Sequence, residues 1–425
     1  MRRNKKRFNL RVFLLIFFGI AVAAALFIAI KIKSFYTGIY TPGSGVVRAT
    51  LPPEKSVFNI LMLGYGGGKH DGTYLTDSMM LLQVDTKNNK AVLFSIPRDI
   101  WVKVPTNSGR DFHIKINAIY QMGLFAKDFP DVSSQYAGDG KLLKYVVQNI
   151  TGLPIDNYIA VDFEGFTKAI DILGGIDVNV AKTFDDNEYP IDGKENDMCG
   201  KEEQFKQIQK YMEAPTLTPD EQTDRDKLFT EHPDLKQFMD DITDNPPAAF
   251  PCRYEHLHFD AGLQHMKGTT ALKYVRSRHG IQDGGDFGRA ARQQRFLTAV
   301  KEKVLNVTFI PKIVPLLDEL KQHIAMDVSV DEIQKFLGET KDAGTYHLTN
   351  YVLSDQNYLK NARSADGQYI LVADEGIDQW NGVHQGVQNV IDGITPSPIP
   401  TITPLPTRAP RTLSPTHTLS PKPMQ

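Results

Sequence analysis

The stretch VFNILMLG, residues Val57 to Gly64, decides the fold that this sequence predicts. It is a continuous apolar run that ends in glycine, and two similar runs, SMMLLQVD at 78–85 and AVLFSIP at 91–97, follow at short intervals. Runs of this kind are typical of strands that are buried within a central sheet. Further strand candidates are IDNYIAV at 155–161, GGIDVNV at 174–180 and QYILVAD at 368–374.

Two segments among these runs have helical periodicity, GKLLKYVVQNITG at 140–152 and DFEGFTKAIDILGG at 162–175. Gly152 and Gly174 are placed to end the two helices, and Asp162 is placed to cap the start of the second. The apolar stripes are Leu142, Val146 and Ile150 in the first segment and Phe163, Phe166, Ile170 and Leu173 in the second. Strands that alternate with helices predict a layered α/β domain.

The N-terminus predicts a membrane anchor. Six cations between Arg2 and Arg11 precede an uncharged apolar run from Val12 to Ile30, which is long enough to cross a bilayer at about 20 residues per span. The excess of cations before the run places the N-terminus in the cytoplasm and the remainder outside the cell membrane, as a single-pass protein. A cleavable signal peptide is the alternative, because Ala23 to Ala25 offer small residues.

Composition divides the rest of the chain. Residues 1–33 form the basic stub and span, and 34–55, rich in Gly and Pro, form a linker. One large folded domain is expected over 56–392, and the Pro/Thr-rich tail at 393–425 cannot bury a core. Within the domain, 194–253 is charged and helix-prone, which indicates an insertion. The insertion is flanked by Cys199 and Cys252, which can either pair outside the cell, closing a loop worth about 4 kcal/mol, or remain free thiols.

The charge balance limits the partners. With 48 basic and 50 acidic residues, the net charge is -2, so the chain lacks the overall basic field that binding to nucleic acid requires. An anion site must therefore be built locally.

The segment ALKYVRSRHGIQDGGDFGRAARQQRF, 271–296, contains the densest group of cations. Arg276 and Arg278 alternate on a predicted strand and so share a face. Asp286 is a candidate N-cap for the helix that follows. On that helix Arg289, Gln293, Phe296 and Val300 form one stripe, with Arg292 beside it and Arg295 turned away. Cations in a first helical turn oppose the helix dipole unless an anion binds there, which favours a phosphate site over a solvated helix face.

Two further motifs supply polar residues after strands. In SIPRDIWVKVP, Arg98 and Asp99 follow a strand end, where ligands collect in such sheets, although Asp99 could equally cap a turn. Lys115, in HIKINAIY, is weaker support for an anion site. In GYGGGKHDGTYLTD the Walker pattern is absent, which disfavours an ATPase, while Asp77, Asp71 and His70 are candidate ligands for a hard cation or caps of a turn.

Taken in order, these motifs resemble the LytR-CpsA-Psr family of cell-wall glycopolymer transferases. The similar stretches are LTDSMMLLQVD, SIPRDIWVKVP, KINAIY, YIAVDFEGFTKAIDILGGIDV, AGLQHMKGTTALKYVRSRHG and DFGRAARQQ. The resemblance implies a three-layer α/β/α domain with a central mixed sheet and an apolar pocket for a polyprenyl chain. It also implies an Mg²⁺-dependent phosphotransferase that moves a glycopolymer from an undecaprenyl-pyrophosphate carrier to a peptidoglycan acceptor.

The resemblance also implies roles for single residues. Arg98, Asp99 and Asp286 are the catalytic candidates, with Asp286 expected to deprotonate the acceptor hydroxyl. Asp77 and Asp71 are the metal candidates, although Gly66 and Leu75 stand where the family usually carries an aspartate and an arginine. The apolar stripes could line the lipid pocket or belong to the core. The expected ligands of the pyrophosphate are Arg98, Lys115, Arg276, Arg278, Arg289, Arg292 and Gln293.

Two other functions stay open at the level of sequence. A polyprenyl-pyrophosphate phosphatase would use the same arginines with water as the acceptor. A noncatalytic, membrane-anchored glycopolymer-binding or regulatory protein would bind the ligand without Mg²⁺-dependent turnover.

Overall fold

A computed structural model describes residues 30, 33, 56–68, 72–138, 140–213, 217–304, 318–328 and 346–394. The predicted span at 12–30 lies outside these residues, apart from Ile30, and so does the tail from 395 onward. Within the described part of the chain, none of the helices combines the length and the apolar character that crossing a bilayer needs.

The core of the domain is a six-stranded mixed sheet in the order β11-β6-β1-β2-β3-β12. β1 runs parallel to β6, and β3 runs parallel to β12, while β2 is antiparallel to both β1 and β3. It follows that β1, β3, β6 and β12 all point the same way, so their carboxyl ends share one edge. The strands are β1 (Val57–Tyr65), β2 (Thr76–Asp85), β3 (Lys90–Ile96), β6 (Asn157–Asp162), β11 (Ile324–Met326) and β12 (His347–Val352).

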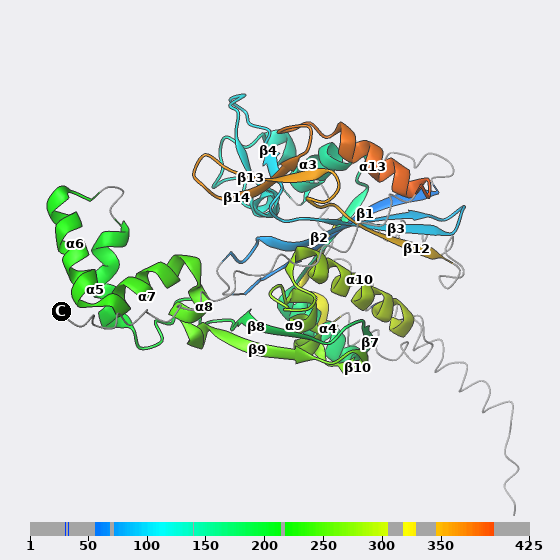
Figure 1. Cartoon of the computed structure of the whole chain (residues 1–425). Helices are drawn as coiled ribbons and strands as arrows, with labels where there is room; N and C mark the ends of the chain where they lie inside the picture. Colours follow the sequence, from blue (N-terminus) through cyan, green and yellow to red (C-terminus); the bar gives the residue numbers. More distant parts are fainter. Residues whose placement is uncertain are drawn as a thin grey trace, which may run out of the picture.

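One face of this sheet is packed into the main core. Alternate side chains of β1 and β2, such as Leu61, Leu63 and Leu81, are fully or almost fully buried there. The layer over this face contains α2 (Ile119–Leu124), α3 (Lys141–Thr151) and α13 (Asn381–Ile391), with the short pairs β4 (Trp101–Lys103) with β5 (His113–Lys115) and β13 (Leu359–Arg363) with β14 (Tyr369–Ala373). Figure 1 shows α3 and α13 above the sheet.

The opposite face is covered by α4 (Phe163–Leu173), α9 (Gly268–Arg276) and α10 (Gly285–Val304), which lie below the sheet in Figure 1. These helices share a second core with β7 (Ile176–Val180), β8 (Phe184–Pro190), β9 (Tyr254–Phe259) and β10 (Gly262–Met266). The mixed α/β fold with a central mixed sheet is therefore as predicted, with helices on both faces.

The local signals at the two predicted helices are confirmed. Asp162 caps α4, its Oδ1 accepting a hydrogen bond from the Gly165 amide at 2.7 Å. Gly152 and Gly174 follow α3 and α4 with φ of 72° and 80°, a left-handed conformation that costs glycine little. GGIDVNV and QYILVAD do form strands, but β7 pairs with β10 and β14 pairs with β13, outside the central sheet.

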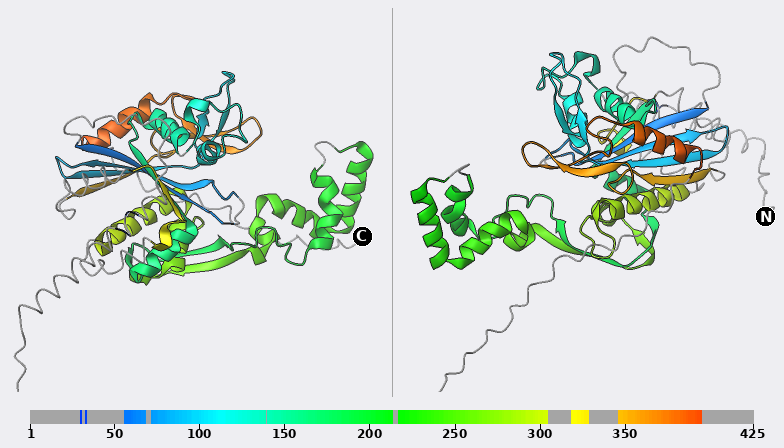
Figure 2. Two further views of the ribbon diagram at one scale, coloured as in Figure 1. Left: turned by 180° about the vertical axis from the view of Figure 1, so that it is seen from behind. Right: turned by 45° about the horizontal axis from the view of Figure 1, so that its top comes forward.

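The cysteine-flanked segment is an arm made of helices. It connects β8 to β9 and consists of α5 (Glu202–Glu213), α6 (Pro219–Glu231), α7 (Pro233–Asp244) and α8 (Pro246–Ala249). The arm has its own small core around Ile208, Leu235 and Phe238, and the Cys199–Cys252 disulfide closes its base. It projects away from the sheet at the end of the β8–β9 pair (Figures 1 and 2). The charged, helix-prone segment thus forms a helical unit with a core of its own, and the two cysteines are paired.

Candidate active site

A cavity of about 470 Å³ lies between the lower face of the central sheet and helices α4, α9 and α10. On this face the strand alternation places apolar side chains that remain partly accessible, because the helices do not pack directly onto them. Met62 pairs with Met80 and with Ile159, so the three side chains form one row across β2, β1 and β6. Further apolar residues of the lining are Val161, Phe163, Phe166, Pro190, Leu272, Val275, Phe296 and Leu297.

The two predicted apolar stripes lie in different places in the folded domain. Phe163 and Phe166 of α4 line the cavity, whereas Ile170 and Leu173 of the same stripe are buried in the second core. Leu142, Val146 and Ile150 of α3 are buried in the main core on the other side of the sheet. The periodicity is the same in both helices, and only the packing of the layers separates them.

The arginines that the sequence places far apart converge on the cavity. Arg98, Arg276, Arg278 and Arg289 all line it, together with Gln293. Arg98 follows β3, and the neighbouring lining residues Gly64, Asp77 and Asp162 lie at the same edge of the sheet, where the four parallel strands end. Ligands of such sheets collect at the carboxyl edge of the strands, because the loops there are free to carry polar groups.

Arg276 is the last residue of α9, so the predicted strand at Arg276 and Arg278 is wrong. The helix forms because Ala271, Tyr274 and Val275 recur at helical spacing and are buried, which outweighs the alternation of the two arginines. A cation in a last helical turn is favoured by the helix dipole. Arg278 lies in the loop after the helix and still reaches the same cavity.

The Arg276 guanidinium is held by its neighbours at the cavity wall. Its Cζ lies 4.2 Å from the centre of the Phe163 ring, and its Nη1 donates to the Tyr189 hydroxyl at 3.2 Å. The same nitrogen forms an ion pair with Asp192 at 3.2 Å. Burial raises the pKa of Tyr189 to about 12, against the opposing effect of Arg276, so the phenol stays protonated. A stacked guanidinium of this kind is oriented in advance for an oxyanion.

Asp186 fixes the loop that carries the arginines. Its carboxylate is completely buried and accepts hydrogen bonds from the Ser277 hydroxyl at 2.6 Å and from the amides of Arg278 and His279 at 3.2 and 3.1 Å. No sequence pattern indicates a role for Asp186, Tyr189 or Asp192 in the site, because β8 and the residues after it meet α9 and the loop that follows only in the folded chain.

On α10, Arg289 and Gln293 face the cavity as the helical stripe predicts. The Arg289 side chain is largely buried, and Gln293 accepts from the Ser78 hydroxyl at 3.2 Å and donates to the Val275 carbonyl at 3.2 Å. Phe296, one turn further along, is buried against Phe166. The helix begins at Gly285, so Asp286 is its second residue and not its N-cap, and the placement of the Asp286 side chain lies outside the description.

Arg292 does not have the predicted role, because the structure places its guanidinium in the protein interior. The side chain is fully buried and is absent from the cavity wall. Its guanidinium donates to the carbonyl oxygens of Tyr274, Ser277 and Asp283 and forms an ion pair with the Asp283 carboxylate at 3.3 Å. Burial lowers the pKa of this guanidinium, and Asp283 opposes the shift. Arg292 therefore holds the loop between α9 and α10 in place.

Asp99 and Lys115 also lie behind the cavity wall. They form an ion pair with each other at 2.8 Å, and the Asp99 carboxylate also lies 3.7 Å from Arg98 Nε. The predicted catalytic role of Asp99 and the predicted phosphate contact of Lys115 do not fit these positions. Both residues instead support Arg98, whose Nη1 donates to Asp77 Oδ1 at 2.5 Å.

Asp77 is the predicted metal candidate that the structure places at the site. Both Asp71 and His70 lie outside the described residues. Another lining carboxylate, Asp162, already accepts from the Gly165 amide and lies 2.9 Å from the His323 ring. In the described part of the chain, the single group of three metal-type ligands is Asp197 with Cys199 and Cys252, and its two sulfurs form the disulfide.

Four arginines on the wall of a largely apolar cavity are typical of the class of site that suits an anionic head group attached to an apolar tail. Comparison with known sequences agrees with this class, since the family model described as LytR_cpsA_psr matches residues 42–380. The chain belongs to the LytR_cpsA_psr family.

Three known proteins illustrate the similarity. The polyisoprenyl-teichoic acid–peptidoglycan teichoic acid transferase TagU of Oceanobacillus iheyensis is 26% identical, with 77% of this chain and 75% of TagU covered. The transferase of the same description, TagV of Bacillus subtilis, is 25% identical over 66% of this chain and 52% of TagV, about half of its length. The crystal structure of B. subtilis TagV aligns at a TM-score of 0.48 and 21% identity, with 80% of this chain and 98% of that chain covered.

Proposed function

We propose that this protein transfers a glycopolymer from a polyprenyl-pyrophosphate carrier to a hydroxyl of peptidoglycan. The observation that carries the proposal is the convergence of Arg98, Arg276, Arg278 and Arg289 on one apolar cavity. The apolar part matches a polyprenyl chain and the arginines match two linked phosphates, whose oxygens guanidinium groups bind in a bidentate manner. The relatives TagU and TagV are named as transferases of teichoic acid to peptidoglycan.

The arginines lower the barrier by neutralising charge. The acceptor oxygen forms a bond to the phosphorus on the glycan side, and the bond from that phosphorus to the bridging oxygen breaks. Polyprenyl phosphate leaves, and the hydroxyl proton passes to a carboxylate, for which the family resemblance favours Asp286. Phosphoryl transfer depends mainly on positioning and on electrostatic stabilisation of the phosphate oxygens. Arg276 and Arg289, which are largely buried beside apolar walls, supply that stabilisation in a medium of low dielectric constant.

The donor set fits Mg²⁺, which commonly binds one or two protein carboxylates and completes its shell with phosphate oxygens and water. Asp77 would hold the ion, since its carboxylate lines the cavity beside Arg98. Bound there, Mg²⁺ would supply further neutralisation of the phosphate oxygens. The test is the Mg²⁺ concentration for half-maximal turnover, which we expect to rise at least tenfold in Asp77→Asn.

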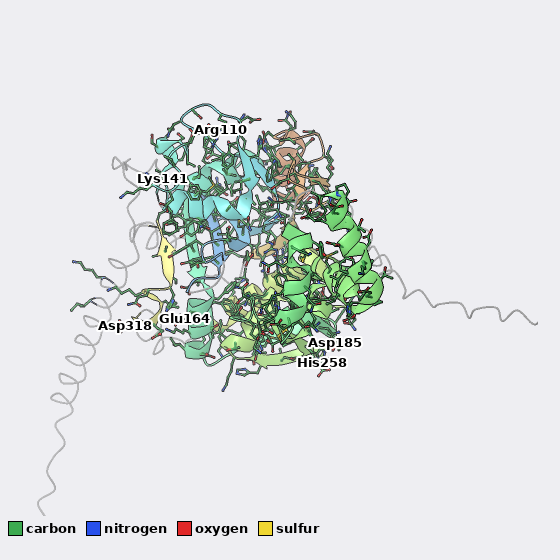
Figure 3. All side chains as sticks on the ribbon, turned by 90° about the vertical axis from the view of Figure 1, so that its left-hand side faces the viewer. Arg110, Lys141, Glu164, Asp185, His258 and Asp318 are labelled. Atoms are coloured by element: carbon green, nitrogen blue, oxygen red, sulfur yellow. A yellow bond between two sulfur atoms is a disulfide. The ribbon has the colours of Figure 1, made fainter. Side chains whose placement is uncertain are left out.

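The transfer itself is tested with arginine variants of the full chain. We expect Arg276→Ala and Arg289→Ala each to lower the rate of transfer from a prenyl-pyrophosphate saccharide to peptidoglycan oligosaccharide by about 10²- to 10³-fold. Arg110→Ala is the matched control, because Arg110 is exposed and does not line the cavity, and it lies at the end of the domain opposite Asp185 and His258 (Figure 3). Unchanged transfer in both cavity variants would refute the proposal.

The same assay separates the two alternatives. A phosphatase would release prenyl phosphate at the same rate with and without oligosaccharide. Its glycan product would also be the same in both cases. Tight binding of the pyrophosphate without any turnover identifies a binding or regulatory protein.

The location in the cell is part of the proposal. The run from Val12 to Ile30 anchors the protein in the cell membrane, with the N-terminus in the cytoplasm and the domain outside. This position brings the cavity to the lipid carrier and to the wall. The retention of the apolar run in the mature protein, measured by mass spectrometry of the membrane fraction, tests it against a cleaved signal peptide.

A further inference from the structure

A second, smaller cavity of about 210 Å³ shares part of its lining with the first. It lies at the carboxyl ends of β3 and β12, next to the start of α10 at Gly285. Four residues line both cavities, Asp77, Ser78, Arg289 and Gln293. The phosphate-binding groups therefore stand as a shared wall between the two cavities.

The lining of the second cavity suits a sugar. It offers the hydroxyl groups of Ser95 and Ser354, the carboxylate of Asp355 and the ring of Tyr369, which is 45% exposed. Hydroxyls and carboxylates bond sugar hydroxyl groups, and an accessible aromatic ring packs against the apolar face of a sugar ring. Apolar side chains, among them Met79, Ile96 and Leu371, complete the wall beside these polar groups.

A hydrogen-bond network keeps these groups in position before any ligand arrives. The Tyr369 hydroxyl donates to Asn361 Oδ1 at 2.6 Å, and Asn361 Nδ2 donates to Asp355 Oδ2 at 2.8 Å. Asn361 and Tyr369 lie on the antiparallel pair β13 and β14, and Asp355 precedes that pair. Groups fixed in this way lose little entropy on binding.

We propose that this second cavity binds the acceptor, a peptidoglycan saccharide, and presents its hydroxyl to the phosphate at the shared wall. The proposal rests on the proposed transfer reaction. In phosphoryl transfer the attacking and leaving oxygens lie roughly in line on opposite sides of phosphorus. If the prenyl phosphate leaves toward the first cavity, the acceptor must approach from the side of the second.

The step balances without a further reactant. The acceptor oxygen forms the new bond to the glycan-side phosphorus, the bond to the bridging oxygen breaks, and the electron pair leaves with the prenyl phosphate. The hydroxyl proton passes to the carboxylate that acts as base in the proposed transfer reaction.

The test measures the KM values of both substrates in the full chain, with a prenyl-pyrophosphate disaccharide as donor and uncross-linked peptidoglycan oligosaccharide as acceptor. We expect Tyr369→Ala and Asp355→Asn to raise the KM for the acceptor about tenfold and to change the KM for the donor less than about twofold. Tyr369→Phe keeps the ring and should raise the acceptor KM less than Tyr369→Ala does. Asp366→Asn is the control of equal charge change, since Asp366 lies in the exposed turn between β13 and β14 and not in the cavity.

Each outcome supports or overturns the proposed acceptor site. An acceptor KM equal to that of the wild type in Tyr369→Ala and Asp355→Asn, while Arg276→Ala abolishes transfer, overturns the acceptor site and leaves the proposed function intact. A parallel rise in both KM values also overturns it, because the cavity would then serve the donor. Full transfer in Arg276→Ala would refute the proposed function itself.

Discussion

Replacing Arg292 by methionine separates an arginine that holds the fold from those that bind the ligand. Arg292 and Arg289 lie on the same helix, one turn apart, but only Arg289 lines the cavity. Methionine has a similar length and no charge, so Arg292→Met removes the guanidinium contacts while filling most of the volume. We expect this variant to lose stability rather than specific affinity for the pyrophosphate.

The size of the loss follows from the contacts. The guanidinium donates to three carbonyl oxygens, pairs with Asp283 at 3.3 Å and has its Cζ 4.7 Å from the centre of the Phe184 ring. Hydrogen bonds to a charged group contribute about 1.5–3 kcal/mol each, but desolvation of the buried cation offsets much of their sum. Removing one partner of such a buried group costs about 3–5 kcal/mol, a large part of a typical stability of about 5–15 kcal/mol.

Urea unfolding followed by tryptophan fluorescence measures this loss, with Arg276→Met as the matched control. Arg276 lines the cavity and its ion-pair partner Asp192 is 54% exposed, so no charge is left buried when Arg276 is replaced; the midpoint should shift less than in Arg292→Met, and pyrophosphate binding should weaken strongly. The reasoning is refuted if Arg292→Met unfolds at the same urea concentration as the wild type, or if Arg276→Met is the less stable variant of the two.

Three further outcomes are expected. Met80→Trp narrows the apolar cavity, so the KM for a long prenyl pyrophosphate should rise more than the KM for a short one, and an equal rise would contradict the assignment of the lipid site. Replacing Cys199 and Cys252 by serine removes a constraint worth about 4 kcal/mol. Because the arm has its own core, limited proteolysis should then cut within 199–252 while the sheet stays intact, and equal protease resistance with and without the bridge would contradict this. The pKa of His258 is raised by its hydrogen bonds to Asp185 and Asp260, and Asp185 lies beside His258 in Figure 3. The contribution of His258 to stability is therefore full below about pH 6.5 and is lost as the pH rises through the raised pKa. The difference in melting temperature between wild type and His258→Gln should accordingly be larger at about pH 5 than at about pH 9, and no change with pH would refute it.

Much of the fold could be predicted because its signals are local. The apolar run at 57–64 becomes β1 whatever surrounds it, since such a run must be buried and ends at glycine. Asp162 caps α4 through the amide of Gly165, three residues along, so short-range sequence is enough to predict it.

The predictions of site residues are wrong where one residue type can either bind a ligand or hold the fold together. Arg289 and Arg292 are equally plausible phosphate ligands in a sequence, and the burial of Arg292 depends on the loop at 277–283, whose carbonyl oxygens it binds. Asp99 and Lys115 follow strands as ligand-binding residues do, but they neutralise each other behind Arg98. The residues Asp186 and Asp192 come from strand β8 and the turn after it, and no pattern near them indicates contact with α9.

Composition and order of motifs alone predicted an α/β domain with clustered arginines and a separate helical segment, because strand runs, helix caps and clustered arginines are properties of neighbouring residues. The three-dimensional packing decided which arginines line the cavity, which apolar side chains line it and that a second cavity meets the first at Asp77 and Arg289. These outcomes depend on contacts between segments separated by a hundred or more residues, such as Ser78 with Gln293, and the free energy of each side chain there is set by neighbours that the chain supplies only on folding.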